Sequence, residues 1–257
     1  MTPLDQAHQA MQASDAEADR MRFFERLADA ELFLLLEAEP QGDQIEPMVF
    51  DTGEVKLLVA FDREDRLTAF TGAIAPYAAL SGRAIAQMIA GSGYGLGVNL
   101  DNADRAIVLP PEAVDWLNET LSEMPQAVSE RPIEIAAPSG LPEVLLQALD
   151  TKLALAAGLA SAAFLVSVTY APARPGHLLA FVGAPASAEG ALAQAVSEAL
   201  VFSGLDAGEL DVGFFASDDA MVDRLAKVGL RFDLPAPEQA LHPKPPGSDP
   251  DNPPKLR

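Results

Sequence analysis

Residue types that commonly carry out covalent or acid-base chemistry are sparse in this sequence. It contains no cysteine, which excludes a thiol nucleophile and a thiolate metal site, and it has three histidines. His8, His177 and His242 fall in a predicted helix, at the start of a predicted strand and in a proline-rich tail, a spacing that indicates no catalytic triad. No GxSxG, HExxH, SxxK or P-loop pattern occurs. We therefore expect no catalytic residue, no metal site and no cofactor, and a protein that is not an enzyme.

The 38 acidic residues leave one enzymatic alternative. A carboxylate-based site acting on an amino acid or a related metabolite would need two close acids with raised pKa values. It would also need a neighbouring arginine, for which Arg83 and Arg105 are candidates. Acids are so abundant that the sequence singles out no pair.

A glycine-rich stretch, GSGYGLGVNL at residues 91–100, is the most unusual local pattern. If residues 94–100 form a strand, the large side chains share one face, and the other face carries Gly93, Gly95, Gly97 and Asn99. Such a bare face suits the close approach of another backbone, a helix or a ligand. It does not fit a dinucleotide fingerprint, which needs GxGxxG spacing between a strand and a helix.

We expect a partner or ligand to bind at this bare face, around Gly95, Gly97 and Asn99, with Arg105 and the single tryptophan, Trp116, following closely in the chain. The groove between two domains is the other candidate site, since ligand pockets favour domain interfaces.

Composition limits the class of protein and its partners. A chain of 257 residues with 49% hydrophobic content can bury two ordinary cores. The net charge of −21 argues against nucleic acid and against anionic membrane surfaces. The longest apolar run, residues 153–168, falls short of the ~20 residues that a membrane helix needs, and the polar start has no signal-peptide pattern. We therefore expect a cytoplasmic protein with no membrane or nucleic-acid partner.

Hydrophobic periodicity predicts an alternation of helices and strands. In the first half we expect helices at 3–14, 15–29 and 76–90, strands at 31–37, 45–50, 55–61, 67–71, 94–100 and 105–109, and a helix that starts at Pro110. In the second half we expect strands at 133–137, 163–170, 177–183, 210–216 and 230–234, and helices at 141–157, 188–202 and 218–228. The first six of these later elements follow the β-α-β-β-α-β order of ferredoxin-like folds.

These elements predict an α+β protein with two α/β-type domains and mixed or antiparallel sheets. The first domain covers residues 1–125, and residues 125–132 read as a linker. The second domain, residues 126–236, is expected to be ferredoxin-like with an extra αβ unit. Residues 237–257 are dense in proline and predict a disordered tail.

Four segments carry a resemblance to a known family. They are AELFLLLE, VKLLVAFDREDRLTAFTG, YAALSGRAIAQMIAG and GYGLGVNLDNADRAIVLPPEAVDWL. Together they resemble the N-terminal domain of the bacterial SseB family, named for enhanced serine sensitivity, over most of residues 17–125. A later segment, LDVGFFASDDAMVDRLAKVGLRFDLP, is similar to the SseB C-terminal domain.

The resemblance implies a link to serine sensitivity and amino-acid metabolism, and it brings no catalytic residue with it. We therefore expect a non-enzymatic protein that binds a protein partner or a small molecule. A third hypothesis, assembly through exposed sheet edges, belongs to a different class. The sequence leaves the ligand, the partner and the oligomeric state open.

Overall fold

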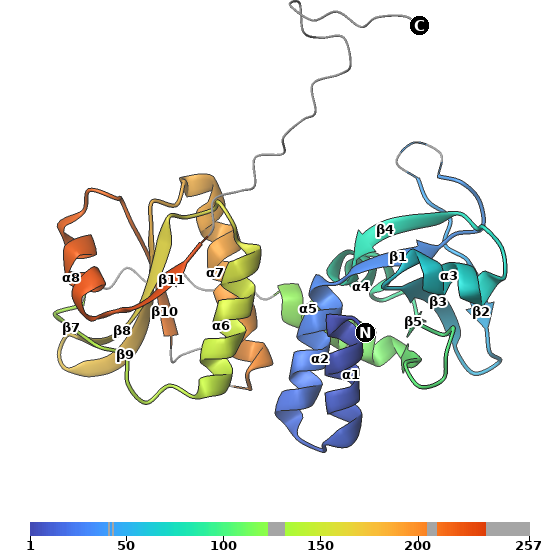
Figure 1. The fold of residues 1–257 in the computed structure, drawn as a ribbon, viewed down its shortest axis with the longest axis horizontal. Coiled ribbons are helices and arrows are strands. Elements are labelled where there is room, and N and C mark those ends of the chain that lie inside the picture. Colours follow the sequence, from blue (N-terminus) through green and yellow to red (C-terminus); the bar gives the residue numbers. More distant parts are fainter. Residues whose placement is uncertain (41, 43, 123–131, 205–209, 235–257) are drawn as a thin grey trace, which may run out of the picture.

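Two mixed β-sheets, each flanked by helices, make up the two halves of the protein in a computed structural model (Figure 1). The structure describes residues 1–40, 42, 44–122, 132–204 and 210–234. We call residues 1–122 the N-terminal half and residues 132–234 the C-terminal half. The expected α+β class with two sheet-containing regions is confirmed.

The N-terminal half contains five helices and six strands among its described residues. The helices are α1 (Pro3–Ala13), α2 (Glu17–Asp29), α3 (Glu64–Thr71), α4 (Gly82–Ile89) and α5 (Pro111–Ser122). The strands are β1 (Glu31–Leu35), β2 (Val49–Asp51), β3 (Lys56–Phe61), β4 (Tyr77–Ser81), β5 (Tyr94–Val98) and β6 (Ile107–Leu109). They pair in the order β4-β1-β3-β5-β6, with β2 also on β3. Only β3 and β5 run parallel to each other among these pairs.

The apolar run of β3 explains how this sheet is covered. Leu58 and Ala60 point to a large core formed with α1, α2, α4 and α5, whereas Val59 and Phe61 point to a smaller core under α3. A strand that is buried on both faces needs apolar residues at every position, because its side chains alternate between the faces.

Two predicted elements of the N-terminal half are wrong. The strand predicted at 67–71 is the end of helix α3, which has two acids in its first turn and ends at Gly72 in the left-handed region (φ 70°). The helix predicted at 76–90 is divided, because β4 first pairs with β1 and Ser81 then caps α4. The predicted strand at 94–100 is confirmed over Tyr94–Val98, as β5, and it is wrong at its end, because Asn99 leaves the strand at φ 54°.

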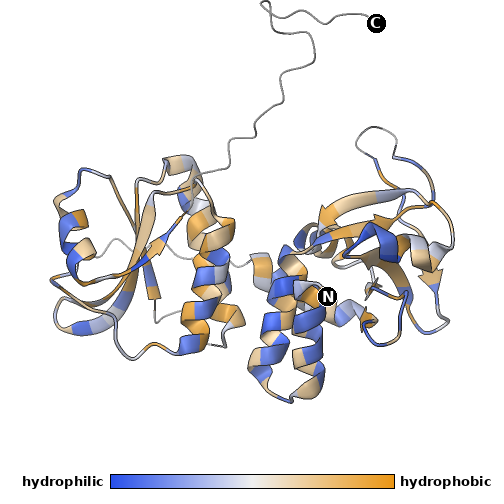
Figure 2. Ribbon diagram, in the orientation of Figure 1, coloured by the Kyte–Doolittle hydropathy of each residue, from blue (hydrophilic) through white to orange (hydrophobic). Residues whose placement is uncertain are grey.

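The C-terminal half contains three helices and five strands among its described residues. The helices are α6 (Glu143–Leu155), α7 (Ala186–Phe202) and α8 (Ala220–Val228). The strands are β7 (Glu134–Ala136), β8 (Ala162–Tyr170), β9 (Arg174–Val182), β10 (Leu210–Phe215) and β11 (Leu230–Asp233). Helices α6 and α7 pack on one face of the sheet and α8 on the other. Figure 2 shows both sheets mostly in the apolar colours, while α1 and α2 alternate between polar and apolar residues.

The expected ferredoxin-like order is wrong for this sheet. A split βαβ unit has two parallel strands joined by a helix and separated by a third strand. Here β7 and β8, which α6 joins, are antiparallel and directly paired, and β9 and β10, which α7 joins, are parallel neighbours. The observed order is β10-β9-β8-β11, with β7 on β8 as well.

The predicted division into domains at residues 125 and 126 stays a prediction, because residues 123–131 lie outside the described part of the chain. The tail predicted at 237–257 lies outside it too. The two halves are in contact, since Phe202 at the end of α7 is buried in the large core of the N-terminal half. The two halves therefore share an interface to which helix α7 contributes.

Candidate functional site

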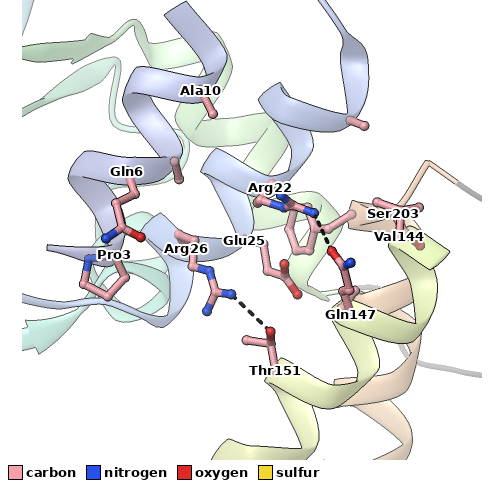
Figure 3. A pocket seen from close by; sticks show the side chains of 14 residues that line it. Pro3, Gln6, Ala10, Arg22, Glu25, Arg26, Val144, Gln147, Thr151 and Ser203 are labelled. Carbon is pink, nitrogen blue, oxygen red and sulfur yellow. Dashed lines mark hydrogen bonds between the residues drawn. The ribbon is translucent and has the colours of Figure 1, made fainter. Parts of the chain in front are cut away.

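A groove of about 420 Å³ lies between the helices of the two halves. Helices α1 and α2 form one wall, and α6 with the end of α7 forms the other (Figure 3). Its polar lining consists mainly of Gln6, Arg22, Glu25, Arg26, Gln147 and Thr151. The groove between domains was one of the two sites expected from the sequence.

Glu25 is the most unusual residue of this groove. Its side chain is buried, with 4% of the residue exposed, and Oε1 has no hydrogen-bond partner among the described residues. Burial raises the pKa of Glu25, and the positive charges of Lys152, Arg26 and Arg22 oppose that shift. A buried carboxylate oxygen without a donor is unfavourable, which makes Glu25 a ready acceptor for a ligand.

Two arginines flank Glu25 on α2 and reach across the groove. Arg22 Nη2 donates to Gln147 Oε1 at 3.5 Å, and Arg26 Nη2 donates to Thr151 Oγ1 at 3.1 Å. Figure 3 shows both arginines and Glu25 pointing from α2 toward α6. The groove therefore presents an acceptor between two positively charged donors.

A cluster of four charged side chains joins the halves beside Glu25. Lys152 Nζ of α6 donates to Asp29 Oδ2 at 2.5 Å and to Glu198 Oε2 at 2.9 Å. Arg83 of α4 donates to both oxygens of Glu198 at 3.0 Å and to Asp29 Oδ1 at 2.7 Å. The cluster has two positive and two negative charges, so its formal charge is balanced.

The electrostatics of this cluster favour the charged forms of Glu198 and Arg83. Burial pulls the pKa of Glu198 upward, but the hydrogen bonds and charges of Arg83 and Lys152 outweigh burial and lower it. The hydrogen bond to Glu198 holds the pKa of Arg83 above its ordinary value against the effect of burial. Arg83, which the sequence offered for an enzymatic site, is thus engaged in an ion-pair network between the halves.

A second charged cluster lies at the start of α1. Arg66 forms two hydrogen bonds with Asp5, at 2.8 and 2.6 Å, and one with Asp62 at 2.7 Å. The hydrogen bond from Arg66 lowers the pKa of Asp5, and burial lowers the pKa of His8. His8 is buried and packs its ring 5.9 Å from that of Phe23. A small cavity of about 250 Å³ adjoins these residues.

The glycine face of β5 is filled by neighbouring residues of the same chain. A Cβ atom at Gly95 would lie 2.5 Å from the carbonyl oxygen of Leu109 and 2.8 Å from Leu57 Cδ2. A Cβ atom at Gly97 would lie 2.7 Å from Leu100 Cδ1. Gly95 and Gly97 therefore admit a close neighbour, as the sequence predicted, and that neighbour is the chain itself. The prediction is wrong for Gly93, which precedes β5 and has open space where a Cβ atom would lie.

The other predicted face residues lie in different places. Asn99 is buried at φ 54°, where its Oδ1 accepts a hydrogen bond from the backbone of Asp62 at 3.1 Å. Arg105 pairs with Asp101 at 3.0 Å and lines the small cavity near His8. Trp116 packs its ring 4.9 Å from that of Phe24 in the large core. The structure thus does not bring the predicted residues together into one surface.

Sequence reasoning missed the groove residues because their partners are distant in the chain. Arg22, Glu25 and Arg26 fall largely on the polar side of α2. Such a side is predicted to face solvent unless another helix is known to pack against it. Lys152 and Glu198 carry a weak sign of burial in the sequence, because each is a charged residue beside the apolar stripe of its helix.

Neither a metal site nor a membrane-spanning helix is found in the part of the chain that the structure describes. No group of three or more His, Cys, Asp or Glu side chains there is placed to hold a metal ion. No helix within the same ranges has both the length and the apolar character needed to cross a membrane.

The fold and the groove define an α+β protein whose two halves share a charged interface. Residues 4–116 match the family model of the SseB protein N-terminal domain. This part of the chain is therefore similar to the SseB protein N-terminal domain, and the resemblance seen in its sequence is confirmed. No curated protein and no solved structure matched the chain. The likeness of the C-terminal half to the SseB C-terminal domain stays a prediction.

Proposed function

We propose that this protein is a non-enzymatic binding protein that holds a small molecule or part of a protein partner in the groove between α2 and α6. It works in the cytoplasm, and the family name links it to serine sensitivity and amino-acid metabolism. The buried carboxylate of Glu25, which lines the groove without a partner for Oε1, is the observation that carries the proposal. Such a group gains a hydrogen bond when a ligand enters.

The electrostatics favour binding over the enzymatic alternative. A carboxylate-based site would need two close acids with raised pKa values, and burial raises the pKa of Glu25. Glu198, in the ion-pair cluster with Lys152, has a lowered pKa, because Arg83 and Lys152 bind its charged form more strongly than burial disfavours it. Glu198 is thus held as an ion-pair partner and is poorly suited to accept a proton.

Affinity capture with a groove-filling variant tests the proposal. The tagged protein is purified from the cytoplasm of its own cells, and proteins and metabolites that co-purify are identified by mass spectrometry. Ala10 lines the groove, so Ala10→Phe should block it, whereas Ala13→Phe places the same ring at the exposed end of the same helix. We expect a molecule that co-purifies with the wild type and Ala13→Phe and is lost from Ala10→Phe.

Two results would contradict the proposal. If Ala10→Phe keeps every molecule that the wild type captures, the groove is not the binding site. If a folded Gly97→Leu variant loses the captured molecule while Ala10→Phe keeps it, the strand face is the site instead. Circular dichroism of each variant shows whether the fold is intact.

A further inference from the structure

Three side chains on one turn of α2 present opposite charges to the groove. Glu25 lies three positions after Arg22 and one before Arg26, and all three line the same groove. In the described part of the chain neither arginine forms an ion pair with Glu25. Each instead makes one hydrogen bond to a neutral side chain of α6.

Most N–H groups of Arg22 and Arg26 remain available to donate further hydrogen bonds. A guanidinium group has five N–H donors, so a single hydrogen bond leaves most of them for water or a ligand. Their bonds to Gln147 and Thr151 hold both groups over the groove. Planar guanidinium groups suit carboxylates in particular, which they bind through paired hydrogen bonds.

The groove therefore matches a ligand that carries both charges. A simple anion would be attracted by Arg22 and Arg26 and repelled by the carboxylate of Glu25. A simple cation would be attracted by Glu25 and repelled by the two arginines. A zwitterion satisfies both, and about 420 Å³ falls within the range of small-molecule sites.

We infer that the groove takes a free α-amino acid, whose ammonium group donates to Glu25 and whose carboxylate accepts from Arg22 and Arg26. This inference rests on the proposed function and names the class of ligand. Gln6, Gln147 and Thr151, which also line the groove, are then placed to contact the amino-acid side chain.

Binding of amino acids to the full chain tests the inference. The twenty standard L-amino acids are screened one at a time by thermal shift, and the strongest stabiliser is measured by calorimetry beside its N-acetyl and its amide derivatives. The N-acetyl form lacks the ammonium group and the amide lacks the carboxylate. We expect each derivative to bind at least about tenfold more weakly, since a charged hydrogen bond is worth about 1.5–3 kcal/mol.

Matched variants separate binding from folding. Glu25→Gln should weaken the amino acid about tenfold or more. It should also abolish the preference for the free amino group over the N-acetyl form, which a merely structural role would leave unchanged. Glu17→Gln, at an exposed acid of the same helix, should bind as the wild type does. Arg26→Gln should remove the preference for the carboxylate, with the exposed Arg20→Gln as its control.

The outcomes distinguish this inference from the proposed function. If none of the twenty amino acids stabilises the protein, or if Glu25→Gln binds the amino acid with unchanged affinity, the inference is overturned. The proposed function still stands if Ala10→Phe loses the molecule that the wild type captures. If Ala10→Phe keeps every captured molecule, both fail.

Discussion

Replacing Lys152 with methionine tests the charged interface between the two halves. Lys152 is 3% exposed and donates hydrogen bonds to both Asp29 and Glu198, so its loss leaves Arg83 as the one cation that pairs with these two carboxylates among the described residues. Removing one partner from a buried ion pair costs about 3–5 kcal/mol. For a chain of this size, that corresponds to a fall in melting temperature of roughly 6–20 °C.

Two probes of urea unfolding measure this cost and locate it. The single tryptophan, Trp116, reports the N-terminal half by fluorescence, and far-ultraviolet circular dichroism reports both halves. Because the cluster joins the halves, we expect the two transitions to coincide in the wild type and to separate in Lys152→Met.

A further variant, which also removes an acid of the cluster, and a control at an exposed lysine complete the test. Adding Glu198→Gln to Lys152→Met restores the charge balance around Arg83, so the double variant should be at least about 0.5 kcal/mol more stable than the sum of the single effects predicts. Lys227→Met changes an exposed lysine of α8 and should stay within about 0.5 kcal/mol of the wild type. If Lys152→Met unfolds like Lys227→Met, the account of the interface is refuted.

Three further predictions concern stability and are checked by urea unfolding. Burial raises the pKa of Glu25, so its charged form destabilises the fold at pH 7. Glu25→Gln should therefore be about 1 kcal/mol more stable than the wild type at pH 7. This difference in stability should shrink as the pH falls toward 4.5, where the wild-type carboxyl takes up a proton in both states. Arg66 lowers the pKa of Asp5, so Arg66→Met should lose about 3–5 kcal/mol at pH 7, and its deficit should narrow below about pH 4, where Asp5 takes up protons in the unfolded chain. Gly95→Ala places a Cβ atom against the backbone of β6 and should lower the free energy of unfolding by about 1–3 kcal/mol. Gly190→Ala, in open space on α7, should raise it by about 0.5–1 kcal/mol. Equal effects at the two glycines would contradict the packing described for β5.

The sequence predicted elements whose burial pattern is strong. The helix predicted at 141–157 and the strand predicted at 163–170 follow from a clear apolar stripe and a clear apolar run, and they are present as Glu143–Leu155 and Ala162–Tyr170. The segment at 67–71 misled because it is the end of a short helix with a single buried apolar residue, Leu67. The ferredoxin-like arrangement predicted for the second sheet was wrong, because the order of elements along the chain does not fix which strands pair.

The candidate site was predicted only in outline. A groove between the halves followed from general rules on ligand sites, but its residues did not. Glu25 lines the groove together with Val144 and other residues of α6, which are more than a hundred residues away in the chain, so the sequence alone could not pair them. Gly95 and Gly97 were rightly read as admitting a close neighbour, and the chain itself supplies that neighbour through Leu57, Leu100 and Leu109.

The most direct test of the binding site is a titration of the ¹⁵N-labelled protein with the amino acid that stabilises it most, followed by nuclear magnetic resonance. We predict that the amide signals of residues 22–26 on α2 and 147–151 on α6 shift first and saturate together. Shifts confined to the strand at 94–98, or no saturable shift on either helix, would contradict binding in the groove.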